Sequence, residues 1–106
     1  MPRYEVYENI SEKVKDLSRA RQSLIEEIEA IMFYDERADV TTDKELKYIM
    51  MHNRDDEKEH FSLILEYLRR KDPALGQLLL AKASELVAVL PSIREWSFIE
   101  TQRLAG

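Results

Sequence analysis

The sequence contains neither glycine nor proline between residues 3 and 72. These two residues most often end helices, so a stretch of this length without them favours long helices. One short polar segment, residues 38–43, interrupts it, and Thr42 is predicted to cap the helix that follows. The sequence therefore predicts two helices, at about residues 5–37 and 43–70, joined by a short turn.

A further helix start follows the second of these helices. Asp72 and Pro73 have the order of a helix cap and a first helical residue, and they predict a third, shorter helix that ends near Leu90. Residues 92–106 form a tail whose role is open. We expect one all-α domain over residues 1–106, an antiparallel two-helix hairpin plus a short C-terminal helix.

The composition excludes several classes of protein. The chain has 106 residues, 44% apolar and 35% charged, as in a soluble amphipathic helical protein. It has no cysteine, which excludes disulfides and thiolate metal sites, and its net charge of -5 disfavours a nucleic-acid partner. Its apolar runs are too short to cross a membrane. We expect a cytoplasmic protein without a membrane or nucleic-acid partner.

Both long helices carry a stripe of residues at the spacing of a buried helical seam. In the first helix the stripe consists of Ala20, Leu24, Glu27, Ile31 and Tyr34. In the second helix it consists of Leu46, Met50, Asn53, Glu57, His60, Ile64 and Tyr67. A hairpin of two such helices cannot cover its own apolar surface, so we expect a homo-oligomer.

Three ionisable residues, Glu27, Glu57 and His60, interrupt these stripes. A buried carboxylate without a partner is costly, so their position needs a reason. Glu57 and His60 are three residues apart on one helix, and Glu-x-x-His with a glutamate from another helix is half the ligand set of a di-iron carboxylate bundle. Two chains would supply the whole set, which predicts a dimer with the metal site between its subunits.

Two other interpretations of these residues stay open. Glu57 and His60 could be a solvated pair on the helix surface. Alternatively, the three residues could form a buried ion-pair network with Arg54 or Lys58, although both of these lie off the stripe. His52 also lies off the stripe, which favours a surface position.

Two longer motifs carry a family resemblance. They are EExEAxxxYDxR, at residues 26–37, and HNRDxEKEH, at residues 52–60. With the threonine-containing turn between them, the segment 25–72 resembles the encapsulated ferritin family.

The resemblance implies a ferroxidase that oxidises Fe(II) with oxygen or peroxide. Subunits of this family pair into a ferritin-like four-helix bundle around two iron ions, five dimers form an annular decamer, and an encapsulin nanocompartment in the cytoplasm encloses the assembly. By position the iron ligands are Glu27, Glu57 and His60, Tyr34 lies close to the metal, and Glu26 and Glu29 are outer carboxylates that attract incoming iron.

Two features depart from the family. Phe33 stands where the family often has tryptophan, and residues 92–106 lack the flexible linker that usually precedes a targeting peptide. The ligand set alone also fits a rubrerythrin-like peroxide-reducing protein or a manganese-binding protein. A third alternative is a non-catalytic helical assembly module, in which the seam charges set the pairing register.

Overall fold

The computed structural model describes residues 5–89, and they contain helices and no strand. The prediction of an all-α chain is therefore confirmed. The chain divides into two compact units, Met1–Asp72 and Pro73–Gly106, which are described separately. The predicted tail at 92–106 lies outside the described residues. The elements are a 3-10 helix η1 (Tyr7–Asn9) and the α-helices α1 (Glu12–Val40), α2 (Lys44–Lys71) and α3 (Pro73–Val89).

The first long helix begins later than predicted. We expected it to start near residue 5, but α1 starts at Glu12, after Ser11, whose hydroxyl accepts a hydrogen bond from the Val14 amide at 3.3 Å. The preceding segment is instead held against α1 through Tyr7. Its hydroxyl accepts a hydrogen bond from Arg19 at 3.0 Å, and the Lys15 ammonium lies 4.4 Å from its ring centroid.

The turn of the hairpin is shorter than predicted, and a different residue caps α2. Helix α1 extends to Val40, and the N-cap of α2 is Asp43, so the prediction of Thr42 is wrong. The Asp43 carboxylate accepts a hydrogen bond from the Leu46 amide at 2.9 Å, and its own amide donates to the Thr41 hydroxyl at 3.2 Å. A carboxylate is favoured here because its negative charge also interacts with the helix dipole.

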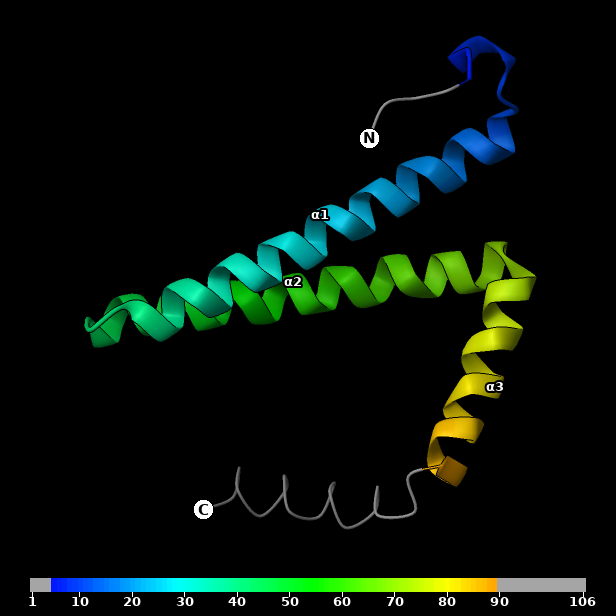
Figure 1. Cartoon of the computed structure of the whole chain (residues 1–106). Helices are drawn as coiled ribbons and strands as arrows, with labels where there is room; N and C mark the ends of the chain where they lie inside the picture. The colour runs from blue at the N-terminus through cyan, green and yellow to red at the C-terminus, as the bar shows by residue number, and fades with distance from the viewer. Residues whose placement is uncertain (1–4, 90–106) are drawn as a thin grey trace. The chain divides into compact units, whose positions relative to one another are not determined.

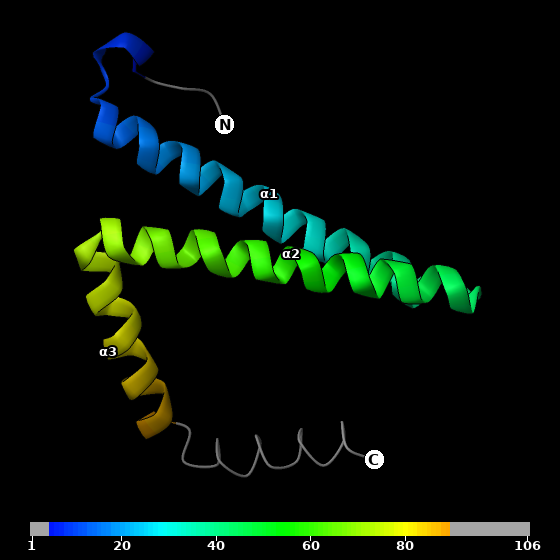
Figure 2. The ribbon, with the colours of Figure 1, turned by 180° about the vertical axis from the view of Figure 1, so that it is seen from behind.

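Helices α1 and α2 run antiparallel and pack against each other (Figures 1 and 2). They lie close together near the turn and diverge toward their other ends (Figure 1). The two buried side chains among the described residues are Ala38 of α1 and Leu68 of α2, which are 4% and 2% exposed. All five residues of the stripe predicted for the first helix are half-buried.

The covered stripe of α2 differs from the predicted one by about one residue. Phe61, which the predicted stripe did not include, is half-buried, and Leu68 is buried. Three residues of the predicted stripe, Leu46, His60 and Tyr67, are exposed. Glu57 and Ile64 belong to both stripes and are half-buried. Met50 and Asn53 of the predicted stripe are also half-buried, so the prediction holds for four of its seven residues and fails at Leu46, His60 and Tyr67.

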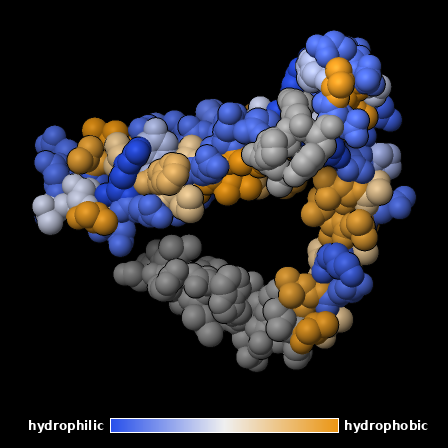
Figure 3. All heavy atoms as spheres, turned by 45° about the horizontal axis from the view of Figure 1, so that its top comes forward, coloured by the Kyte–Doolittle hydropathy of each residue, from blue (hydrophilic) through white to orange (hydrophobic). Residues whose placement is uncertain are grey.

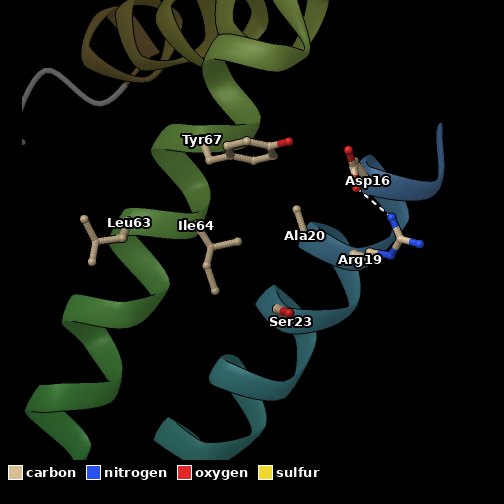
Figure 4. Close-up of a pocket in the computed structure, with 7 residues that line it drawn as sticks. All are labelled: Asp16, Arg19, Ala20, Ser23, Leu63, Ile64 and Tyr67. Atoms are coloured by element: carbon tan, nitrogen blue, oxygen red, sulfur yellow. Dashed lines mark hydrogen bonds and ion pairs between the residues drawn. The ribbon is translucent and has the colours of Figure 1, made fainter. Parts of the chain in front are cut away.

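The hairpin has two faces, which are named here by residues of α2 that flank Glu57. At about 100° per residue, His60 lies about 60° to one side of Glu57 and Arg54 about 60° to the other. The front face carries His60, Leu63 and Tyr67, and the back face carries Arg54. A groove of about 370 Å³ on the front face separates the diverging helices (Figure 4).

Many large apolar side chains of the hairpin remain exposed (Figure 3). On α1 and α2 they are Val14, Ile25, Ile28, Met32, Phe33, Val40, Leu46, Tyr48, Ile49, Met51, Leu63 and Tyr67. A lone hairpin this apolar and with so small a core resembles part of a larger bundle. This agrees with the expectation of a homo-oligomer, which stays a prediction.

Helix α3 is apolar on more than one side. Its exposed large residues include three consecutive leucines and reach its end: Leu78, Leu79, Leu80, Leu86, Val87 and Val89. Within residues 5–89, no helix combines the length and the apolar character that a membrane crossing needs.

Replacing Asp43 by alanine should lower the free energy of unfolding by about 1 kcal/mol, because the first turn of α2 loses its cap. Thr42→Ala is the matched control and should have almost no effect, since Asp43 and not Thr42 caps the helix. Urea unfolding followed by circular dichroism measures both. Equal losses in the two variants would contradict the assignment of the cap.

Candidate metal centre

Both long helices contribute to one cluster of ionisable side chains. Glu27 comes from α1, Glu57 and His60 come from α2, and one ligand atom of each lies within 4.8 Å of the others. The His60 Nδ1 is 3.3 Å from an oxygen of Glu57 and 3.8 Å from an oxygen of Glu27. Glu57 and His60 meet because residues three apart share one side of a helix.

The two carboxylates lie in the helix contact and lack full compensation. The side chains of Glu27 and Glu57 are 21% and 23% exposed, whereas that of His60 is 55% exposed on the front face. The Oε2 atom of Glu27 is buried and accepts no hydrogen bond from the described residues. Two charged carboxylates this close repel each other by roughly 3 kcal/mol at an effective dielectric constant near 20. A cation between them would remove both penalties.

The basic residues nearest in sequence do not neutralise the cluster. Arg54 donates hydrogen bonds to Asp35 of α1 at 2.8 Å and to Asp55 at 3.1 Å. Lys58 forms its ion pair with Asp55, at 3.8 Å. Within residues 5–89, the ion-pair partner of Glu27 and Glu57 is His60, so the alternative in which Arg54 or Lys58 is their counter-ion finds no support.

The donor set fits a divalent transition metal. Two carboxylates and one imidazole are ligands that Fe(II) accepts, and one chain leaves further coordination positions open. The half-exposed His60 borders these open positions on the front face, where more ligands could approach.

The other predicted site residues lie outside this three-residue cluster. Tyr34 is half-buried in the seam, and the guanidinium carbon of Arg37 lies 5.7 Å from its ring centroid. Glu26 and Glu29 are exposed on α1. His52 is exposed, as its phase predicted, and lies 3.4 Å from Asp56.

The link between Arg54 and Asp35 was not predicted from the sequence. Asp35 belongs to the first motif and Arg54 to the second, so each motif holds one member of a contact between α1 and α2. The hydrogen bond that Arg54 donates to Asp35 raises the pKa of Arg54 above its ordinary value. No local sequence pattern indicates this pairing, because each helix carries several charged residues that could have faced the other.

A family model described as EncFtn-like matches residues 2–86, which include both motifs and all three helices nearly to their end. The chain belongs to the EncFtn-like family. The family resemblance found in the sequence is thereby confirmed.

Two similar proteins support this assignment. An encapsulated ferritin-like protein of Rhodospirillum rubrum is 48% identical over 69 residues, which are 65% of this chain and 49% of that protein. A ferritin-like protein of Thermotoga maritima is 41% identical over 76 residues, 72% of this chain and 67% of that protein. The chain therefore spans about half the length of the first relative and about two thirds of the second.

A solved structure agrees with the fold. A crystal structure of a Nitrosomonas europaea protein superposes with a TM-score of 0.72 at 43% identity, and the match covers 76% of this chain and 89% of that one.

Glu27→Gln should raise the free energy of unfolding of the metal-free protein by about 1 kcal/mol. The neutral amide no longer repels Glu57 and can donate a hydrogen bond to it. Urea unfolding in the presence of a chelator measures the change. Glu26→Gln, the same substitution at the exposed neighbouring residue, is the control and should leave stability unchanged. A loss of stability in Glu27→Gln would show that the two carboxylates are not in conflict.

Proposed function

We propose that the chain is a ferroxidase, which oxidises Fe(II) to Fe(III) at a di-iron centre formed by two copies of the chain. The observation that carries the proposal is the cluster of Glu27, Glu57 and His60, in which two carboxylates lie together in a helix contact and, within residues 5–89, pair with His60 and with no lysine or arginine. Membership of the EncFtn-like family supports iron as the metal.

Two chains are needed because one supplies only half of a di-iron ligand set. A di-iron carboxylate bundle takes four carboxylates and two histidines, and each chain offers two and one. The half-exposed His60 and the exposed apolar residues Leu63 and Tyr67 give the front face the character of a subunit interface. Two copies joined through it would form a four-helix bundle with two iron ions.

The ligands have distinct roles in this proposal. Glu57 would be the ligand shared by the two iron ions, while Glu27 and His60 would each hold one ion. The negative charge of the two carboxylates would favour Fe(III) over Fe(II), which assists the loss of an electron. Each of two Fe(II) ions gives one electron to the oxidant. When the oxidant is dioxygen, the two electrons and two protons convert it to hydrogen peroxide.

Three further residues support the reaction. Glu26 and Glu29 are exposed on α1, where their charge would attract incoming Fe(II). Tyr34 shares the seam with Glu27, two turns along α1, and we assign it a place close to the metal centre. These roles follow the family pattern at matching positions of this chain.

We further propose that the product is stored inside an encapsulin shell in the cytoplasm. The Rhodospirillum rubrum relative is named as an encapsulated ferritin-like protein, and it is 48% identical to this chain. By the same resemblance, five dimers form an annular decamer. Native mass spectrometry of the iron-loaded protein should detect ten-chain particles.

Aerobic titration with Fe(II), followed by ferric absorbance, tests the reaction. The wild-type chain should oxidise iron faster than buffer, with a break near one iron per chain. Glu57→Ala and His60→Ala should fall to the buffer rate, because each removes a ligand. Glu59→Ala, at an exposed residue of the same helix outside the cluster, is the control and should retain the wild-type rate.

Two outcomes would decide against the proposal. If the wild-type chain binds no iron and oxidises it at the buffer rate, the seam charges are a pairing device of an assembly module. If the chain reduces peroxide with electrons from an external donor and does not oxidise added Fe(II), the rubrerythrin-like alternative is the better description.

A further inference from the structure

The back face of the hairpin carries an ion-pair bracket between the two long helices, made of Asp35, Arg54 and Asp55. The Arg54 Nη1 donates to Asp35 of α1 at 2.8 Å, and its Nε donates to Asp55 of α2 at 3.1 Å. The Arg54 side chain is only 19% exposed. Its planar fork is thus fixed by one carboxylate from each helix, a geometry that lysine cannot reproduce.

The bracket lies about one turn of α2 and about two turns of α1 from the metal cluster. Arg54 precedes Glu57 by three residues, so both belong to the same stretch of α2, and they differ by about 60° around the helix. His60 lies about 60° to the other side of Glu57, on the front face. The bracket therefore joins α1 and α2 on the side of Glu57 that faces away from His60.

The cluster needs such a restraint when no ion is bound. Glu27 and Glu57 come from different helices, and their like charges favour separation of α1 and α2 at that level. Arg54 joins the same two helices, one turn away along α2 and about two turns away along α1, by an interaction of opposite sign. Metal ligands bind best when their positions are fixed before the ion arrives, because the ion then need not draw the helices together.

We propose that Arg54 is a positioning residue of the metal centre, which holds α1 and α2 through Asp35 at the separation that Glu27 and Glu57 need to share an ion. This inference rests on the proposed metal site. Arg54 itself touches neither ligand in the cluster and does not bind the metal.

Electrostatics alone and the positioning role predict opposite changes in metal affinity for the variant Arg54→Ala. Removing the positive charge of Arg54 near a cation site should strengthen cation binding if charge alone mattered. Loss of the positioning contact should weaken it. Arg54→Ala therefore separates the two effects by the sign of the change in affinity.

The experiment is a Co(II) titration of the full chain, in which the d–d absorption reports both affinity and ligand geometry. Arg54→Ala should weaken Co(II) binding about tenfold, as expected for an outer partner of metal ligands. It should also alter the shape of the absorption band. Arg54→Lys should remain weakened, and the exchanged pair Asp35→Arg with Arg54→Asp should recover much of the affinity.

Arg69→Ala is the matched control. It removes the same side chain from the same helix, but Arg69 pairs with Glu66 within α2, so no contact between helices is lost. Its affinity and band shape should equal those of the wild type. Circular dichroism of each metal-free variant establishes that the helices are intact. If Arg54→Ala unfolds, the exchanged pair still tests whether the contact between the helices supports metal binding.

The outcomes separate the two proposals. Wild-type binding together with equal or tighter binding by a folded Arg54→Ala variant would overturn the positioning role and leave the proposed function standing. If Arg54→Ala unfolds and the exchanged pair folds without regaining affinity, the role is likewise overturned. If the wild-type chain itself binds no Co(II), the metal site fails and the inference fails with it.

Discussion

The conflict between Glu27 and Glu57 is the constraint around which the hairpin is organised. Two carboxylates lie in the contact between α1 and α2, one of their oxygens is buried without a donor, and His60 is their ion-pair partner among the described residues. A stripe of leucine at these positions would give a more stable hairpin. The chain keeps the charges, and a bound cation would turn this conflict into a stabilising contact.

The two faces of the hairpin carry different kinds of residues beside these carboxylates. At the back, Arg54 and Asp35 join the helices by an interaction that is internal to the chain. At the front, His60 is half-exposed and exposed apolar residues such as Leu63 adjoin it. On one face an ion pair within the chain joins the two helices. The other face has the composition of a contact with another copy. Such an arrangement suits a site that is completed by assembly.

The sequence predicted the architecture well and its details less well. The absence of glycine and proline correctly indicated two long helices, and Pro73 correctly marked the start of α3. The start of α1 was placed too early, because the stretch without glycine or proline reaches back to residue 3, whereas Ser11 caps the helix and the segment before it is held by Tyr7. The cap was assigned to Thr42 because a glutamate three residues later completes a capping-box pattern, but Asp43 also suits a cap, and only the backbone geometry distinguishes the two.

The sequence by itself determined the helices and the three ionisable residues of the cluster, since helical periodicity places Glu57 and His60 on one side of α2 and Glu27 in the seam of α1. Only the tertiary structure decided which side of α2 faces α1. Two adjacent stripes of α2 are apolar, so periodicity could not choose between them, and the packing covered Phe61 and Leu68 while leaving His60 at the edge. The tertiary structure also decided the pairing of Arg54 with Asp35. Contacts between distant charged residues depend on the register of two helices, which no local pattern encodes.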